Sequence, residues 1–201
     1  KSKVTELIKI GYEDIRDIPD GLLGDDTLQT RLNAYRTGEK LIPDELRNKL
    51  AQLQFPRYYL DFETIGFAVP KWSGTRPYEQ LPFQWSCHIE AKSMAVSHTG
   101  FLDTSGNPPM QSFSEALINA LGDSGPVIVY STFEKTVLRN LQERYPEYRE
   151  SIQSIIDRLF DLFQPIKTHY FHRDLQGSYS IKNVLPTVVP ALKYSDLLDV
   201  Q

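Results

Sequence analysis

Apolar and polar side chains alternate without interruption from Phe83 to Glu90, with Phe, Trp, Cys and Ile at the odd positions. A period of two places the apolar residues on one side of an extended chain, so this segment is expected to form a half-buried β-strand. Residues 95–102 follow after a short turn-like segment and are expected to pair with it. Cys87 lies on the apolar side of the strand, which predicts a buried structural thiol rather than a nucleophile.

Three later segments indicate the fold class. The apolar run Val127-Ile128-Val129 predicts a fully buried strand. Apolar residues at helical spacing predict a helix over 112–121, another over 133–141, and a third over 148–160 that includes Leu159 and Phe160. A hairpin followed by a helix, a buried strand and further helices indicates an α/β domain, with a mixed sheet flanked by helices.

Residues 1–54 have a different character. They show helical spacing of apolar residues, turn signals and mixed charges, and they contain no group of residues typical of a catalytic site. We expect a small helical linker or appendage over 1–54 and a folded domain over 55–201. The chain starts without methionine and stops at Gln201 after a helix-like segment. We therefore expect it to be a fragment of a larger protein.

Composition and charge exclude several classes of protein. Hydrophobic residues make up 40% of the 201 residues and charged residues 24%, which is typical of a folded domain and not of a disordered chain. No apolar run approaches the ~20 residues needed to span a bilayer, and no signal peptide is visible, so we expect a cytoplasmic protein with no membrane partner. A net charge of −4 argues against a non-specific DNA-coating protein. It does not exclude a nuclease, because bound divalent cations invert the charge of an acidic site.

The pair Asp61 and Glu63 carries the strongest chemical signal. It follows the strand-like Tyr58-Tyr59-Leu60, and residues two apart on a strand face the same side. Two carboxylates about 7 Å apart can share divalent cations, which prefer oxygen ligands. In the alternative interpretation the strand runs out into solvent and both carboxylates are merely hydrated. The apolar neighbours favour burial, where an unpaired carboxylate is costly, but the pair alone leaves both interpretations open.

Glu134 has a comparable setting. It lies in the first turn of an expected helix, directly after the buried strand at Val127 and a short turn. Ligands bind at such strand ends in open α/β sheets. The alternative is that a glutamate in a first turn simply complements the helix dipole, and for Glu134 taken alone this is the preferred interpretation.

Two other segments are weaker candidates for binding. Gly177-Ser178-Tyr179-Ser180-Ile181-Lys182 opens a helix and offers backbone N–H groups and a lysine to phosphate, although such a run is more often only a cap. The loop over 66–82 holds the aromatic residues Trp72 and Tyr78 beside Lys71 and Arg76. These side chains suit base stacking and phosphate binding, or else they simply cover the sheet.

Three segments carry a family resemblance when they are taken together. Tyr-Tyr-Leu-Asp-Phe-Glu-Thr at 58–64, Val-Tyr-Ser-Thr-Phe-Glu at 129–134 and Gly-Ser-Tyr-Ser-Ile-Lys-Asn-Val-Leu-Pro at 177–186 occur in this order. The chain from residue 55 onward resembles a bacterial domain of unknown function, number 2779 (DUF2779), which is similar to the RNase H-like, DEDD-type 3′–5′ exonucleases. Residues 1–54 resemble the connector that follows a RecB/Cas4-like nuclease domain, which makes such a domain the expected neighbour in the parent chain.

The resemblance implies an RNase H-like fold and a metal-dependent nuclease. The implied reaction is hydrolysis of phosphodiester bonds from a single-stranded DNA or RNA end by a two-metal mechanism with Mg²⁺ or Mn²⁺. The implied catalytic and metal-binding residues are Asp61, Glu63 and Glu134. Glu134 stands where the family usually has an aspartate, so its carboxylate is one methylene further from the backbone. The implied substrate-binding residues are Thr64, Trp72, Tyr179 and Lys182.

The family's last acid should lie further along the chain. Asp196 and Asp199 come too early to be confident substitutes, so we expect that acid beyond Gln201 and expect this chain to bind Mg²⁺ or Mn²⁺ weakly and to cleave poorly. The alternative function is a non-catalytic nucleic-acid- or protein-binding module that retains the fold. An acid on a helix downstream of Gln201 would favour the enzyme, and its absence would favour the binding module.

Overall fold

The computed structural model describes residues 2–192, and the chain divides into two compact units. The helical unit consists of Lys1–Asn48 and Pro165–Gln201, and the sheet unit of Lys49–Gln164. The boundary after Asn48 lies near the expected one at residue 54, whereas the residue pattern did not indicate a boundary after Gln164. Within the described residues, no helix is both long enough and apolar enough to cross a membrane.

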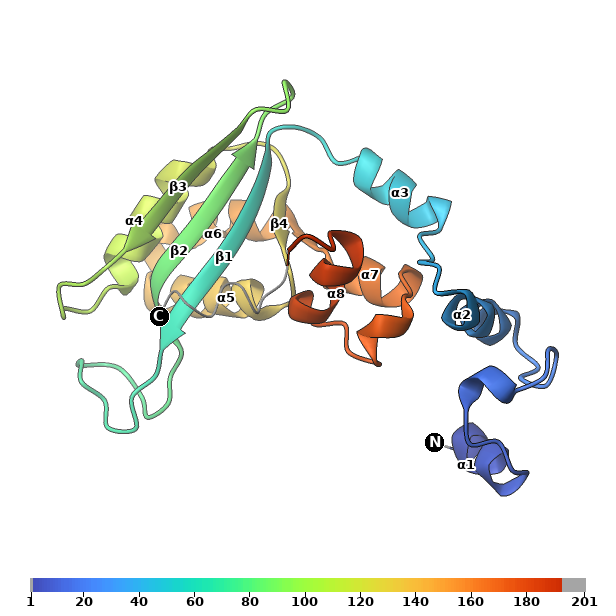
Figure 1. The fold of residues 1–201 in the computed structure, drawn as a ribbon. Helices are drawn as coiled ribbons and strands as arrows, with labels where there is room; N and C mark the ends of the chain where they lie inside the picture. The colour runs from blue at the N-terminus through green and yellow to red at the C-terminus, as the bar shows by residue number, and fades with distance from the viewer. Residues whose placement is uncertain (1, 193–201) are drawn as a thin grey trace. The chain divides into compact units, whose positions relative to one another are not determined.

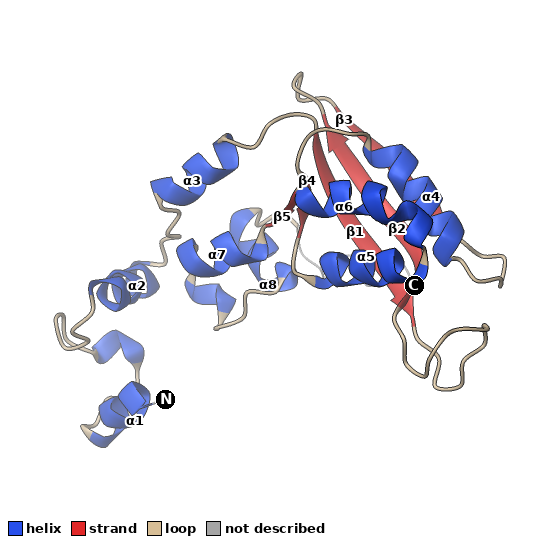
Figure 2. Cartoon of the chain, turned by 180° about the vertical axis from the view of Figure 1, so that it is seen from behind, coloured by secondary structure: helices blue, strands red, loops and turns tan. Residues whose placement is uncertain are grey.

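The sheet unit is built on five strands in the order β3-β2-β1-β4-β5; Figure 1 labels the first four of these, and Figure 2 also labels β5. The strands are β1 (Arg57–Ile65), β2 (Leu81–Glu90), β3 (Val96–Leu102), β4 (Val127–Val129) and β5 (Leu159–Asp161). β1, β2 and β3 form an antiparallel meander, and β1, β4 and β5 run parallel to one another. This mixed sheet confirms the predicted α/β class, and its strand order is consistent with an RNase H-like fold.

Helices cover one face of this sheet (Figure 2). They are α4 (Met110–Leu121), α5 (Phe133–Arg144), η2 (Pro146–Tyr148) and α6 (Arg149–Asp157). Tyr58, Leu60 and Phe62 of β1 are buried, and the residues between them are exposed, as the period of two predicts. The core therefore lies between the sheet and these helices. Phe62 packs edge-to-face on Phe113 of α4, with ring centroids 5.0 Å apart.

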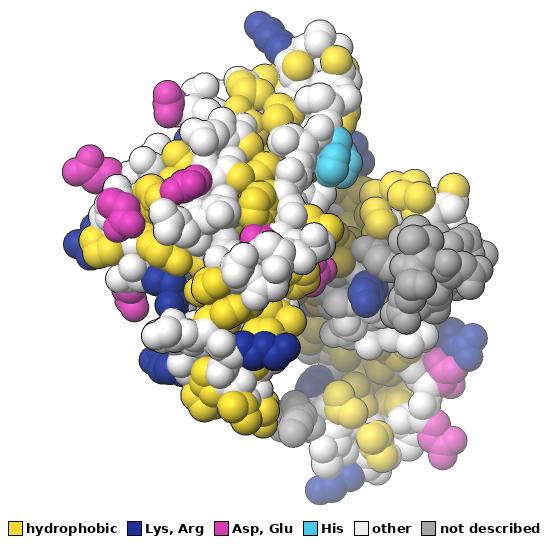
Figure 3. All heavy atoms as spheres, turned by 90° about the vertical axis from the view of Figure 1, so that its left-hand side faces the viewer, with side chains coloured by type: hydrophobic (Ala, Val, Ile, Leu, Met, Phe, Trp, Pro, Cys, Tyr) yellow, Lys and Arg dark blue, Asp and Glu magenta, His cyan; other side chains and the backbone are white. Residues whose placement is uncertain are grey.

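The edge strand β3 and the hairpin beside it agree with the sequence analysis. β2 pairs with β3 from Gln84 to Glu90, and Cys87 of β2 is 0% exposed, which confirms the prediction of a buried thiol. Val96 and Leu102, at the two ends of β3, are exposed. On the side of the molecule drawn in Figure 3, acidic side chains are interspersed with basic, hydrophobic and neutral ones, so this side carries no uniform patch of charge.

The prediction that Leu159 and Phe160 belong to a helix is wrong. α6 ends at Asp157, and Leu159 and Phe160 pair in parallel with β4. The backbone N–H of Val127 donates to the carbonyl of Arg158 at 2.9 Å and so begins this pairing. The apolar residues of α6 and of β5 together show helical spacing, so the pattern does not separate the two elements. A buried parallel strand and a buried helix turn both require apolar residues.

The turn that leads into β4 is closely packed. A Cβ atom on Gly125 would lie 2.1 Å from the carbonyl oxygen of Pro56, and Gly125 has a positive φ of 89°, so only glycine fits there. The guanidinium of Arg158 donates to carbonyl oxygens at the end of α4, including that of Gly122 at 2.8 Å. It satisfies acceptors that the helix itself leaves open. These contacts hold the start of β4 beside β1.

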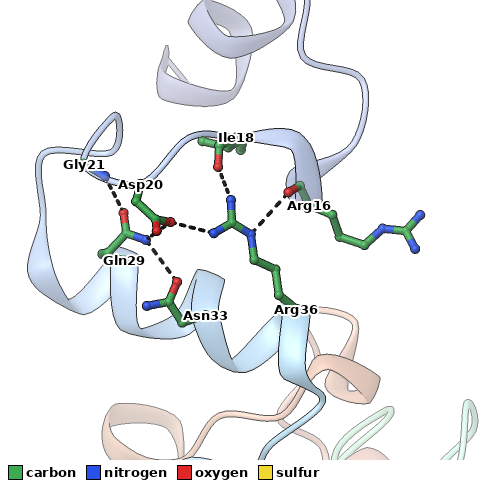
Figure 4. A network of polar contacts seen from close by, with 7 residues as sticks. All are labelled: Arg16, Ile18, Asp20, Gly21, Gln29, Asn33 and Arg36. Carbon is green, nitrogen blue, oxygen red and sulfur yellow. Dashed lines mark hydrogen bonds and ion pairs between the residues drawn. The ribbon is translucent and has the colours of Figure 1, made fainter.

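The helical unit confirms the helical character predicted for its N-terminal part. Its helices are α1 (Ser2–Lys9), η1 (Ile15–Asp17), α2 (Asp26–Thr37), α3 (Asp44–Ala51), α7 (Phe163–His169), η3 (Arg173–Leu175) and α8 (Ile181–Val188), of which α3 and α7 extend across the unit boundaries. Arg36 of α2 donates to the carbonyl of Ile18 and pairs with Asp20 at 2.6 Å, which fastens the preceding turn to this helix (Figure 4). A bridge between Leu41 and Phe171 joins the two parts of the unit.

Candidate active site

The register of the sheet places Asp61 just beyond the end of a neighbouring strand. Tyr59 of β1 lies opposite Ile128 of β4, and β4 ends one residue later, at Val129. Asp61 is exposed on the face of β1 that carries neither Leu60 nor Phe62. The backbone leaves β4, makes a short turn and enters α5, whose second residue is Glu134.

Glu134 is buried without a full set of partners. The residue is 4% exposed, and its Oε2 atom has no hydrogen-bond partner within the described part of the chain. Burial raises the pKa of Glu134 from 4.5 to about 7. A hydrogen bond from its own backbone N–H opposes this rise, and repulsion from Asp61 and Asp161 adds to it. The charges of Asp61 and Asp161 therefore both act on the carboxylate of Glu134.

Asp161 is a member of this group that the sequence analysis missed. It is the last residue of β5 and is half-buried, and its Oδ1 atom accepts a hydrogen bond from the backbone N–H of Phe163 at 2.9 Å. Burial, together with the charge of Asp161, raises the pKa of Tyr130 to about 12. The available signal was an apolar pair directly before an aspartate, which is the pattern recognised at Asp61. The helical spacing of the apolar residues before Leu159 hides this signal, because it predicts a helix that continues through Phe160.

Asp61 and Glu63 face the same side of β1 but differ in their neighbours. Although Asp61 is exposed, partial loss of solvent at its carboxylate raises its pKa, and a hydrogen bond from the backbone N–H of Phe62 opposes this rise. Glu63 is exposed and lies opposite Gln84 of β2, and it is not among the charges that shift the pKa of Glu134. Asp61 and Asp161 thus lie close enough to act on the charge of Glu134, while Glu63 shares only a strand face with Asp61.

The turn between β4 and α5 contains a strained residue. Ser131 has a φ of 144°, which is rare for a residue other than glycine. Its hydroxyl oxygen accepts a hydrogen bond from the backbone N–H of Phe133 at 3.1 Å, which stabilises the unusual geometry. Strained backbone of this kind persists where the surrounding structure imposes it, and it is frequent at functional sites. Here it sets the direction in which α5 begins, and so the position of Glu134.

The donor set has the chemistry that a divalent cation requires. Carboxylate oxygens are the preferred protein ligands of Mg²⁺ and Mn²⁺, and a buried carboxylate oxygen without a partner is relieved by a nearby positive charge. However, among residues 2–192 no three Asp, Glu, His or Cys side chains are grouped closely enough to hold a metal ion. The residue types therefore suit such a cation, but the described residues do not form a complete set of ligands around one position.

The residues expected to bind substrate are divided between the two units. In the sheet unit, the hydroxyl of Thr64 donates to the side chain of Gln80 at 2.8 Å. The half-buried indole of Trp72 donates to the carbonyl of Gly106 at 3.1 Å and packs against the core.

The remaining two belong to the helical unit. The half-buried Tyr179 donates from its hydroxyl to the carbonyl of Tyr170 at 3.2 Å. Lys182 is exposed in the first turn of α8, whose cap is Ser180, so the predicted helix start at this segment is confirmed. Asp196 and Asp199 lie outside the described residues.

Comparisons with known proteins identify relatives without an assigned activity. An uncharacterized protein of Mycoplasma pneumoniae, described as a homologue of MG366, is 29% identical over 160 residues, which cover 73% of this chain and 24% of that protein. The uncharacterized protein UU173 of Ureaplasma parvum is 27% identical over 203 residues, covering 92% of this chain and 29% of the relative. The chain thus spans about a quarter of the length of these curated relatives. No solved structure matches it significantly. The model of the domain of unknown function DUF2779 matches residues 58–180, and the chain therefore belongs to that family.

Proposed function

We propose that the sheet unit is a divalent-metal-dependent phosphodiesterase related to the DEDD-type 3′–5′ exonucleases, acting on single-stranded DNA or RNA ends. The observation that carries the proposal is the buried carboxylate of Glu134, whose Oε2 atom has no hydrogen-bond partner among the described residues and whose charge is affected by Asp61 and Asp161. The strand order supports it. Further support comes from the position of Asp61 on the middle strand and of Glu134 at the start of the helix that follows β4.

The roles of the residues follow from their charges. Three carboxylates repel a phosphodiester, so the group accepts such a substrate only when a cation offsets its charge. A bound Mg²⁺ or Mn²⁺ would supply that charge and would polarise a water molecule for attack on the phosphorus. Asp61 and Glu134 are the residues that would hold the ion, with Glu63 as a further oxygen donor on the same strand face. The bond from the backbone N–H of Phe163 keeps Asp161 oriented.

The small number of protein ligands is compatible with a role in binding Mg²⁺ or Mn²⁺. Magnesium commonly keeps several waters and is held in enzymes by one or two carboxylates together with substrate phosphates. Asp61 and Glu134 supply two such carboxylates. On this basis the chain binds the free ion weakly and binds it better when a phosphate group is present.

The lack of three grouped ligands among the described residues also supports a second candidate function. Because no three ligands are grouped in residues 2–192, a non-catalytic module that binds nucleic acid or protein through this fold remains the alternative. It differs from the enzyme in one respect that is simple to measure: the alternative predicts binding without hydrolysis.

The test compares the 201-residue chain with two variants on 5′-labelled single-stranded DNA and RNA in the presence of Mn²⁺. Asp61→Asn removes one charge from the group, and Asp123→Asn is a matched control at an exposed position between α4 and β4. We expect slow shortening from the 3′ end for the unaltered chain and for Asp123→Asn. For Asp61→Asn we expect a loss of roughly 100-fold or more, the scale of effect that misplacing a reacting group produces.

Two results would contradict the enzyme. Equal hydrolysis by the unaltered chain and by Asp61→Asn would show that the carboxylate group is not responsible for it. Binding of the strands with no hydrolysis in Mn²⁺ would favour the binding module.

A further inference from the structure

A groove runs beside α5 within the sheet unit. A cavity of about 540 Å³ lies between the loop over 76–80 and one face of this helix. The helix contributes Phe133, Thr136, Val137 and Asn140, which recur at the spacing of a single helical face. We call this cavity and its continuation along the helix the α5 groove.

One end of the α5 groove lies at the start of α5, and the groove extends along the helix from there. Phe133, which lines its near end, directly precedes Glu134. A second hollow of about 310 Å³ continues along the helix to Arg144, and Arg76 lines both hollows. From Phe133 to Arg144 the helix axis rises about 16 Å. The groove therefore has the length to hold an extended chain, not only a single small molecule.

The loop that forms the other wall is held in place by several contacts. The side chain of Glu79 accepts a hydrogen bond from the backbone N–H of Arg76 and pairs with Arg144 of α5 at 2.8 Å. The backbone N–H of Tyr78 donates to the carbonyl of Phe67 at 2.8 Å. Side chains on this wall are thus presented from a fixed backbone, which lowers the entropy lost when they bind a ligand.

Tyr78 is placed for stacking. Its side chain lines the groove, it is 75% exposed, and its φ of 56° is unfavourable for any residue except glycine. An aromatic residue kept in a strained conformation, with its ring in solvent, contributes little to folding. Such a ring does suit a planar ligand, since nucleobases stack on exposed aromatic side chains without sequence preference.

Arg76 supplies the complementary charge. Glu79 and Arg144 pair with each other, so their charges largely cancel. Within the described part of the chain, the guanidinium of Arg76 makes no hydrogen bond or ion pair, although its charge helps to lower the pKa of Glu79, and it lies where the two hollows meet. An unpaired guanidinium beside an exposed ring matches the alternating phosphates and bases of a nucleic-acid strand.

We propose that the α5 groove binds a single-stranded nucleic acid, with a base stacked on Tyr78 and a backbone phosphate held by Arg76. The strand then runs along α5 toward Glu134. This inference rests on the proposed function, because it assigns the place where the substrate strand of that function binds. Its test measures binding alone and does not require hydrolysis.

The test measures the affinity of a fluorescein-labelled single-stranded oligo(dT) by anisotropy in EDTA, where no metal-dependent hydrolysis occurs. Tyr78→Gly removes the ring and also relieves the backbone strain, so the variant should fold. We expect its affinity to fall roughly 5- to 100-fold, as for the loss of one stacked base. Tyr78→Phe keeps the ring and should bind as the unaltered chain does. A strand of the same length with abasic sites should bind the unaltered chain more weakly, and Tyr78→Gly should weaken its binding little further.

Arg76→Ala is expected to weaken binding and to reduce the slope of log affinity against log salt by about 0.7, the value for one phosphate contact on a single strand. Lys92→Ala is the control, because Lys92 is an exposed cation of the same unit, in the turn between β2 and β3, and it lines neither hollow. Unchanged affinity in both Tyr78→Gly and Arg76→Ala would overturn the proposal.

The two proposals fail in different ways. If Asp61→Asn abolishes hydrolysis while Tyr78→Gly and Arg76→Ala bind normally, the enzyme stands and the α5 groove is excluded. If the groove variants lose binding while Asp61→Asn hydrolyses normally, the groove stands and the carboxylate site is excluded.

Discussion

The guanidinium of Arg144, in the last turn of α5, lies 2.8 Å from the Oε1 atom of Glu79 in the loop between β1 and β2. Both side chains are largely buried, at 22% and 12% exposure. Burial alone would raise the pKa of Glu79, but the hydrogen bonds from the Arg76 backbone and from Arg144 outweigh it and lower the pKa. This ion pair joins the loop to α5 where both residues line the α5 groove.

Arg144→Met should therefore destabilise the fold by about 1–2 kcal/mol, because Glu79 loses its partner while remaining shielded from water. The double variant with Glu79→Gln should recover part of this loss, since no unpaired charge is left. Urea unfolding at pH 7 measures both. Because the folded-state pKa of Glu79 is lowered, the contribution of the pair is present above its ordinary pKa of 4.5 and is lost as the pH falls below it. Equal stability of all three proteins would show that the ion pair is unimportant.

Glu134 should have the opposite pH dependence. Its pKa is raised from 4.5 to about 7, so the folded state prefers the protonated form and loses stability as the pH rises between these values. The difference corresponds to about 3 kcal/mol at 1.36 kcal/mol per pH unit. In EDTA, Glu134→Gln should match the unaltered chain below pH 4.5 and exceed it in stability by up to that amount above pH 7. Asp123→Asn, an exposed control, should show no such difference. A stability difference between Glu134→Gln and the unaltered chain that does not change with pH would contradict the assignment.

Cys87 should react only when the protein opens. The side chain is 0% exposed, and burial raises its pKa to about 11, so the thiolate is both inaccessible and scarce at neutral pH. We expect a thiol reagent to label the native chain about 1,000-fold or more slowly than the chain in urea, since labelling then follows the rare open state. The chain has one cysteine, so the signal is unambiguous. Similar rates in both conditions would place the thiol at the surface.

Local sequence pattern was sufficient where a side chain's environment is set by its own strand or helix. The alternation along β1 predicted that Asp61 and Glu63 share a face, and the apolar run at Val127 predicted a buried strand before the helix of Glu134. Each inference needs only the period of the element and the identity of its neighbours.

Long-range contacts set the features that the pattern did not reveal. Asp161 joins the site because β5 pairs with β4, and nothing within 148–160 distinguishes that strand from the end of a helix. The form of the loop beside α5 depends on partners far away in the chain, such as Gly106 for Trp72 and Arg144 for Glu79. Sequence pattern showed an aromatic, polar loop at 66–82, but it contained no sign of which residues face the groove.

Mn²⁺ and a nucleotide should stabilise the sheet unit together more than the sum of their separate effects. Asp61 and Glu134 supply too few ligands to hold the ion strongly, and a phosphate adds oxygens to the same ion while the ion offsets the repulsion between phosphate and carboxylates. We expect thermal unfolding to shift little with Mn²⁺ alone or with a nucleoside monophosphate alone. With both present the unfolding temperature should rise clearly. The rise should correspond to about 2–3 kcal/mol of added stability when the ligands are at roughly 100 times their Kd. Asp61→Asn should remove the joint effect, Asp123→Asn should preserve it, and EDTA should reverse it. A joint shift that survives in Asp61→Asn would place the ion elsewhere and remove the basis for the proposed enzyme.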